Sequence, residues 1–375
     1  PAVVHNVKRV TYDEVDAYLD ETFDGSARLP VFTWPPCQPQ PFARAAKNLA
    51  TPQPKKLMRA LQREVSKFTL HRTRNGGFTF PLRKSEFKVE VAGPEAPYLS
   101  PERPTFRNDE PIIKMTLAGS GCSQARDLVA DLMVLTGYAT AEYCLKHDIP
   151  CLYRRQEYPG FWDRPDSELS ALEKDLREVY RTRDRRTGIL EKGGDLVFTM
   201  AKASISVEPG RHFQLGLDAY TRATSPLRRY FDMVSHWQIK AHILAQSSGG
   251  PARFPFDRAA LSGLGVAGTV AETRYKWLES PNRHTWALEL FRRLDAAGSD
   301  AFPRDLRAVA VPDLRSIRLR DSYVSGVHRH PVRIPALGNL AAEVIAPEGA
   351  LNDAIENGNE FAVRLEKIVP DELSM

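Results

Sequence analysis

The sequence predicts an α+β fold that ends in a small barrel of OB type. Before about residue 300, apolar residues recur at helical spacing in several segments, and shorter segments alternate as strands do. After about residue 305 the chain changes to short β-type runs separated by Gly, Pro and Asn. We therefore expect one domain over residues 1–300 and a barrel over residues 301–375.

The composition is that of a globular chain of 375 residues, with 42% hydrophobic and 26% charged residues. These values exclude disorder, collagen and coiled coil as descriptions of the whole. No run of about 18 uncharged apolar residues occurs, so we expect neither a membrane-spanning helix nor a membrane partner. Four scattered cysteines predict reduced thiols, and the net charge of +5 permits nucleic-acid binding without requiring it.

The N-terminal third alternates between helix and strand signals. Thr11 is a plausible N-cap for a short amphipathic helix within residues 10–22. The Pro-rich residues 30–41 predict neither helix nor strand, whereas residues 54–74 have helical spacing with Lys and Arg opposite the apolar face. Strands are expected at residues 78–80 and 87–91.

The clearest helix begins at Ser123 as N-cap and ends before the Ile149–Pro150 dipeptide. Residues 157–193 are polar and carry several arginines. A solvated charged loop is the simpler interpretation, and a phosphate-contacting segment is the alternative. After a Gly/Ser/Pro linker, another helix is expected to end near Leu294.

Five short runs predict the strands of the barrel. They lie at residues 309–311, 317–319, 332–334, 340–344 and 361–365.

The segment from Gln214 to Asp232 holds the chemical signal. Ser225 is a candidate N-cap, Pro226 suits the first helical position, and an apolar stripe is expected to be buried behind them. This stripe comprises Leu227, Tyr230, Phe231, Val234, Trp237 and Ala241. Arg228 and Arg229 would then lie beside the positive end of the helix dipole, where cations are unfavourable. Either a bound phosphate repays that cost, or both arginines pair with carboxylates elsewhere.

The stretch Tyr220-Thr-Arg-Ala-Thr-Ser-Pro-Leu-Arg-Arg-Tyr230 resembles the signature of the ribonuclease II family. Its flanks, residues 208–213 and 232–236, fit the same family. Residues 11–16, 125–133 and 149–154 resemble further family segments in the same order, and the C-terminal strands resemble its OB-fold RNA-binding domain. The resemblance is greatest to the fungal mitochondrial branch.

This resemblance implies an RNB-type catalytic domain, a mixed sheet packed with helices, that shortens single-stranded RNA from its 3′ end and releases nucleoside 5′-monophosphates. It implies Mg²⁺ as cofactor and Arg228 as the group that stabilises the transition state. RNA-binding residues implied with it are Tyr220, Thr224, Ser225, Arg229, His212 and Tyr153, of which the last two could instead be core residues. An RNA helicase partner and a mitochondrial location, otherwise cytoplasmic, are also expected.

The family's metal-binding aspartates have no counterpart in residues 1–10, so we expect the Mg²⁺ ligands upstream of residue 1 and none within the chain. Asp13, Glu14 and Asp16 are expected to be solvated acids that complement a helix dipole. Two interpretations stay open. The chain is the C-terminal part of an exoribonuclease, which its Pro1 start favours, or it is an RNB-like scaffold or regulator that binds RNA without cutting it.

Overall fold

A computed structural model describes residues 10–20, 31–35, 52–80, 84–90, 111–118, 123–190, 200–298, 304–310, 327–347 and 360–366. The chain divides into two compact units. The first unit comprises Pro1–Phe23, Ala45–Pro81 and Ser123–Lys276, and the second comprises Asp24–Arg44, Leu82–Cys122 and Trp277–Met375. A domain boundary near residue 300 stays a prediction.

The first unit is built around three helices, α1 (Tyr12–Leu19), α2 (Pro52–Arg74) and α3 (Gln124–Lys146). Both expected N-caps are confirmed, because Thr11 forms a capping box with Glu14 and Ser123 accepts from the backbone N–H of Arg126.

Asp16 corrects the expectation of a solvated acid. Its side chain is 3% exposed, and its two carboxylate oxygens accept from the hydroxyl of Ser123 and the N–H of Ala125, each at 2.7 Å. The sequence signal was misleading because the partner lies more than 100 residues away. Asp16 therefore ties α1 to the beginning of α3.

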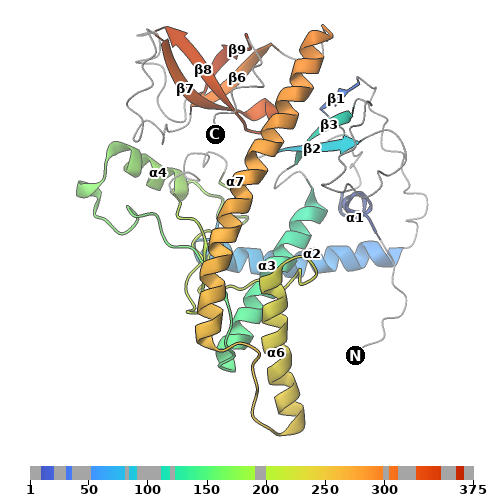
Figure 1. Ribbon diagram of the computed structural model, residues 1–375, viewed down its shortest axis with the longest axis vertical. Coiled ribbons are helices and arrows are strands. Elements are labelled where there is room, and N and C mark those ends of the chain that lie inside the picture. Colours follow the sequence, from blue (N-terminus) through green and yellow to red (C-terminus); the bar gives the residue numbers. More distant parts are fainter. Residues whose placement is uncertain are drawn as a thin grey trace, which may run out of the picture. The chain divides into compact units, whose positions relative to one another are not determined.

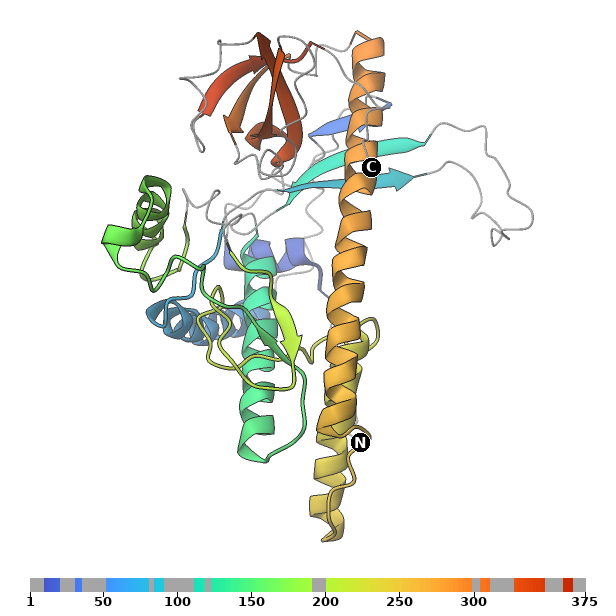
Figure 2. The same ribbon diagram turned by 60° about the vertical axis from the view of Figure 1, so that its left-hand side comes forward.

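Helix α2 crosses α3 (Figures 1 and 2) and is held to it by polar contacts. Asp131 of α3 accepts from the Thr69 hydroxyl at 2.7 Å and from the Arg72 guanidinium at 3.0 Å. In length and composition α3 would suffice to cross a membrane, a property that core helices of soluble proteins share. The expected absence of a membrane-spanning helix therefore stays a prediction.

The described part of the polar segment, residues 157–190, is ordered around an aromatic cluster rather than forming a simple solvated loop. It contains the short helix η3 (Asp166–Glu168) and α4 (Ala171–Arg181), which begins with a capping box between Ser170 and Glu173. The Arg177 guanidinium donates to three backbone carbonyls of this segment. Buried residues of this segment form the cluster together with Phe78 and Phe213 from elsewhere in the chain. The members within the segment are Phe161, Leu169, Leu176, Tyr180 and Leu190. Sequence periodicity missed this because the cluster is assembled from distant segments.

The first unit also contains a two-stranded antiparallel sheet and two further helices. Strand β4 (Tyr153–Arg155) pairs with β5 (Ser204–Ser206). Helix α6 (Tyr230–Ser248) lies beside the first part of α7 (Arg258–Ala296), which continues into the second unit (Figure 2). The expected strand at residues 78–80 is reduced to one isolated bridge between Thr79 and Ile189.

The second unit contains a three-stranded antiparallel sheet in the order β1-β3-β2. Strand β1 (Phe32–Trp34) contradicts the expectation that the Pro-rich segment lacks regular structure, because its three residues pair with β3 (Ile112–Ala118) as an edge strand. Strand β2 (Lys84–Glu90) confirms the strand expected near residues 87–91. The core of this unit includes Ile113, Met115, Leu290, Leu294, Ala308 and Val332.

The C-terminal strands form an antiparallel sheet in the order β8-β7-β6-β9. They are β6 (Asp305–Ala310), β7 (Val327–Ile334), β8 (Leu340–Pro347) and β9 (Glu360–Arg364), with η4 (Pro335–Leu337) between β7 and β8. Four of the five expected runs are therefore strands, and residues 317–319 lie outside the described residues. In the described part of the chain β8 and β9 are edges, so the closed OB barrel stays a prediction.

Gly137 allows a loop to pass close to α3, and a substitution there is expected to be destabilising. A Cβ at Gly137 would lie 2.4 Å from the Thr221 carbonyl oxygen and 2.4 Å from the Tyr220 ring. Gly137→Ala should therefore lower the free energy of unfolding by about 1–3 kcal/mol, although Ala is the better helix former. Chemical denaturation would measure this, with Gly263→Ala of α7 as control, since nothing lies within 4 Å of that Cβ. A gain in stability from Gly137→Ala would contradict the close approach.

Candidate functional site

A cavity of about 410 Å³ opens on the first unit. Three of its lining side chains are cationic, Arg154, Lys202 and Arg222, and no carboxylate belongs to its described lining. The remaining lining residues are Val134, Gln156, Met200, Ala201, Ala203, His212, Gln214, Leu215 and Tyr220. The cavity therefore suits an anionic ligand.

Side chains alternate in direction along residues 220–222. Thr221 is buried, and its two neighbours, Tyr220 and Arg222, line the cavity. Thr221 is 1% exposed, and its hydroxyl donates to the Leu152 carbonyl at 2.5 Å. The N–H of Arg154 donates to the Tyr220 carbonyl at 2.8 Å, which fixes this segment beside β4. Because successive side chains of an extended segment point in opposite directions, Tyr220 and Arg222 face the cavity.

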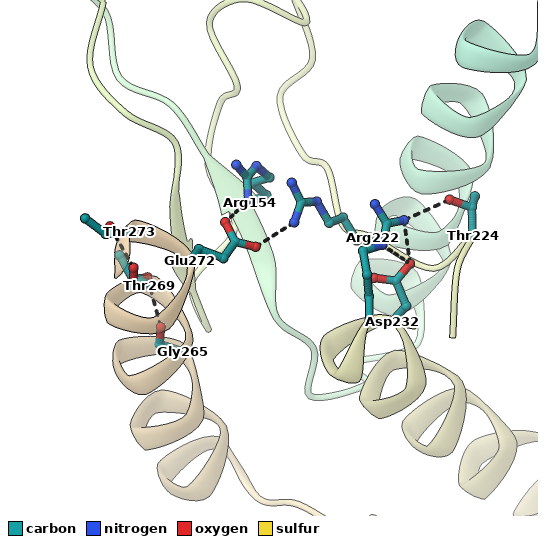
Figure 3. Close-up of polar contacts among 9 residues, drawn as sticks. Arg154, Arg222, Thr224, Asp232, Gly265, Thr269, Glu272 and Thr273 are labelled. Carbon is teal, nitrogen blue, oxygen red and sulfur yellow. Dashed lines mark hydrogen bonds and ion pairs between the residues drawn. The ribbon is translucent and has the colours of Figure 1, made fainter. Parts of the chain in front are cut away.

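Glu272 of α7 joins the two arginines of this cavity (Figure 3). One carboxylate oxygen accepts from Arg154 at 3.0 Å, and the other accepts from Arg222 at 2.6 Å. Burial alone would raise the pKa of Glu272, but the hydrogen bonds and charges of the two arginines outweigh it and hold that pKa below its ordinary value. Burial and the nearby Arg154 charge lower the pKa of Arg222. The carboxylate thus holds both guanidinium groups in place.

His212 and Tyr220 form the aromatic part of the cavity. Their rings meet edge to face at 5.9 Å. Burial, together with the positive charges of Arg154, Arg72 and Arg222, lowers the pKa of His212 to about 3. Burial raises the pKa of Tyr220. Both side chains are therefore neutral near pH 7 and contribute ring surface and hydrogen-bonding groups rather than charge.

The lowered pKa of His212 predicts a loss of stability in mild acid. The folded-state pKa, about 3, lies below the ordinary 6.5, so the unfolded chain binds a proton that the folded chain does not. The free energy of unfolding should then fall by about 1.4 kcal/mol per pH unit as pH drops below about 6.5. His212→Gln should lose this contribution between pH 6.5 and 5, as measured by denaturation at each pH. Parallel slopes for both proteins would contradict the shift.

The turn before α6 corrects the expected helix start. Helix α6 begins at Tyr230 with Arg229 as N-cap, and the carbonyl of Ser225 accepts from the N–H groups of Arg228 and Arg229. Ser225 therefore begins a turn that precedes the helix instead of capping it. The reason is Asp232, whose buried carboxylate accepts from the Ser225 N–H at 2.8 Å.

Arg229 is bound within this turn. Its guanidinium donates to Asp232 Oδ2 at 2.7 and 3.1 Å and to the Thr224 hydroxyl at 3.1 Å. The side chain of Arg229 is 25% exposed, whereas that of Asp232 is fully buried. Of the two alternatives, a bound phosphate or pairing with a carboxylate, the structure shows the carboxylate pair for Arg229.

Arg228 differs from its neighbour. Its guanidinium is exposed and forms no hydrogen bond or ion pair with another described residue, so the backbone N–H alone ties Arg228 to Ser225. The expected apolar stripe is also corrected around it, because Leu227 is 103% exposed, Tyr230 47% and Trp237 37%. The prediction of a continuous buried apolar stripe was wrong because the helix starts later than expected. Its buried face includes the polar Asp232 and Gln238 beside Val234.

The structure separates the six expected RNA-binding residues into three groups. His212 and Tyr220 line the cavity, and Thr224, Ser225 and Arg229 belong to the turn held by Asp232. Tyr153 is 3% exposed within an apolar cluster, and burial raises its pKa. This burial favours the interpretation of Tyr153 as a core residue. An RNA contact by Tyr153 stays a prediction.

Several functional candidates were missed by sequence reasoning. Arg154 and Arg222 lie inside the motif segments, and the alternation of polar side chains around Thr221 was the available signal. Glu272 lies 44 residues beyond Arg228 on a long helix, and no local pattern marks it. Asp232 could have been suggested by its i+3 spacing from Arg229.

Comparison of the sequence with models of known protein families identifies one matching family. The model of the RNB domain matches residues 1–245. An uncharacterized ribonuclease of Synechocystis sp. is 26% identical over 294 residues, which are 78% of this chain and 33% of that protein. Several other relatives are mitochondrial proteins at low identity.

Several solved structures share the fold, and two of them illustrate it. An active-site mutant of the Dss1 exoribonuclease from Candida glabrata has a TM-score of 0.64 and 17% identity, covering 97% of this chain and 37% of that one. The RNase R of Mycoplasma genitalium, in complex with ribose-methylated single-stranded RNA, has a TM-score of 0.56 and 15% identity, covering 96% and 51%. This chain spans a third or less of the length of the curated relatives that it matches first.

Proposed function

The chain belongs to the RNB-domain, or ribonuclease II, family, and we propose that it acts as a hydrolytic exoribonuclease. In this proposal it degrades single-stranded RNA from the 3′ end to nucleoside 5′-monophosphates. Its relatives include mitochondrial exoribonucleases, and the cation-lined cavity is the observation that carries the proposal.

The cavity supports binding of an RNA backbone by charge and shape. Glu272 holds the side chains of Arg154 and Arg222 in place before a ligand binds. Little side-chain conformational entropy is therefore lost when a phosphate enters. Phosphate oxygens accept well from guanidinium groups, and a base or ribose can contact the neutral ring surface of Tyr220 and His212. Such binding is salt-dependent and largely indifferent to sequence.

We assign transition-state stabilisation to Arg228. Its exposed guanidinium is free to reach a ligand, whereas Arg229 is engaged with Asp232 and Thr224 and holds the turn. A cation directed at the charge that develops on the scissile phosphate accelerates hydrolysis most when the backbone that carries it is fixed in advance. In this proposal Asp232, Thr224 and Arg229 supply that positioning.

The RNB family is generally Mg²⁺-dependent, and the metal would activate water and stabilise charge on the phosphate. The described residues do not fit such a site, because no group of three or more His, Cys, Asp or Glu side chains among them could hold a metal ion. The expectation that the Mg²⁺ ligands lie upstream of residue 1 stays a prediction.

The first experiment incubates the protein with 5′-labelled single-stranded RNA of about 30 nucleotides and Mg²⁺. Stepwise shortening from the 3′ end supports the exoribonuclease. Binding without shortening fits both an exoribonuclease whose metal ligands lie upstream of residue 1 and the alternative, an RNB-like scaffold or regulator. Restoring the upstream segment would then separate the two, because only the exoribonuclease should regain shortening. No binding at moderate salt would overturn both. A mitochondrial location and an RNA helicase partner belong to the same proposal, and fractionation with co-purification would test them.

A further inference from the structure

One face of α2 carries a row of exposed cations. With a rotation of about 100° per residue, the row falls within about 80° of the helix circumference. It faces away from Val65, which is 4% exposed, and from the buried Arg72. The row consists of Lys56, Arg59, Arg63, Lys67 and Arg74. We call these residues the α2 stripe.

The charge of this helix is one-sided. Helix α2 contains seven Lys and Arg residues but a single carboxylate, Glu64, which pairs with Lys67 at 2.6 Å. Solvated surfaces usually intersperse both signs, and acids are favoured in a first helical turn, yet the first turn here has none. A hollow of about 750 Å³ beside this end is lined, among described residues, by Lys55, Lys56, Arg59, Gln62 and Arg63. The charge pattern therefore favours an anionic partner.

The stripe leads away from the cavity. At the C-terminal end of α2, the Arg72 guanidinium donates to the carbonyl of Leu215 at 3.0 Å, and Leu215 lines the cavity. The N–H of Gly77 donates to the Arg72 carbonyl at 2.8 Å. Lys56 and Arg74 are 18 residues apart, so the stripe extends along the helix axis for about 27 Å from the cavity wall.

We propose that the α2 stripe binds the phosphate backbone of that part of an RNA strand which lies outside the cavity. This inference rests on the proposed function. The four-residue steps from Arg59 to Arg63 and from Arg63 to Lys67 place these three cations about 6 Å apart along the axis, a spacing suited to consecutive phosphates of an extended strand. An anionic membrane is the less suitable partner, because Leu57 is the single exposed large hydrophobic residue among the α2 side chains that the structure describes.

The test uses the full chain and neutralises two cations of the stripe, Lys56→Ala with Arg63→Ala. The matched control, Lys174→Ala with Lys240→Ala, removes the same charge from exposed positions on α4 and α6. Binding is measured for single-stranded RNA of about 25 and about 5 nucleotides as a function of salt. Lys56→Arg with Arg63→Lys keeps the charge and should restore wild-type binding.

We expect the stripe variant to bind the long RNA about 10- to 30-fold more weakly at about 0.1 M salt, with a salt slope smaller by about 1.4. Binding of the short RNA should not change. Equal behaviour of stripe variant and control would overturn the inference while leaving the proposed function intact. A stripe variant that loses only binding to phosphatidylserine vesicles would also overturn it. A wild-type chain that binds neither RNA would overturn the inference together with the proposed function.

Discussion

Replacing Arg228 by alanine in the complete enzyme is expected to lower turnover of single-stranded RNA by about 10²–10³-fold, with RNA affinity changed only a few-fold. Arg228 is exposed and forms no side-chain contact with another described residue, so its removal should leave the fold intact. Its proposed contribution arises in the transition state, where negative charge on the scissile phosphate increases. Turnover is therefore more sensitive than binding.

The measurement compares single-turnover shortening of 5′-labelled RNA with equilibrium binding of the same RNA. Arg253→Ala is the matched control, because it removes an exposed arginine from the linker before α7. It should leave both quantities near those of the wild type. Equal losses of turnover and affinity in Arg228→Ala would show that Arg228 only binds RNA. Unchanged turnover would remove Arg228 from the mechanism.

Local signals predicted the helices whose ends depend on nearby residues. Thr11 and Ser123 cap α1 and α3 as expected, because a capping side chain reaches an N–H only three residues away. Ser225 has the same local signal, yet α6 begins five residues later. There a side chain from inside the helix, Asp232, takes the Ser225 N–H and stabilises a turn instead. A capping pattern does not reveal such a competitor.

The candidate site was predictable to a similar extent. The motif around residues 220–230 located both the cavity wall and the turn that carries Arg228. The role of Glu272 could not be predicted from the sequence, because its partners Arg154 and Arg222 lie 118 and 50 residues away. Long-range pairing of this kind depends on how α7 packs, which no short pattern encodes.

The division of labour between the two neighbouring arginines follows from the same geometry. A helix that started at Ser225 would have placed both guanidinium groups in its first turn. The turn instead directs Arg229 onto the buried carboxylate of Asp232 and leaves Arg228 in solvent. One arginine thus stabilises the segment, and the other is available to a ligand.

Removing the Asp232 carboxylate is the second large effect that we expect. Asp232→Ala should lower the free energy of unfolding by about 3 kcal/mol, because it breaks a buried pair and leaves the Ser225 N–H without an acceptor. Partial exposure of the Arg229 side chain, 25%, places the loss at the lower end of the range for buried pairs. Denaturant titration would measure it.

Asp218 provides the matched control, since its carboxylate pairs with Arg211 at 2.7 Å but its side chain is 83% exposed. Asp218→Ala should therefore cost less than about 1 kcal/mol. Asp232→Asn, which keeps an acceptor oxygen but removes the charge, should fall between the two. RNA turnover should decline with Asp232→Ala even where the protein remains folded, because the turn that positions Arg228 loses its anchor. Equal stability of the Asp232→Ala and Asp218→Ala proteins would show that the buried carboxylate does not hold this turn.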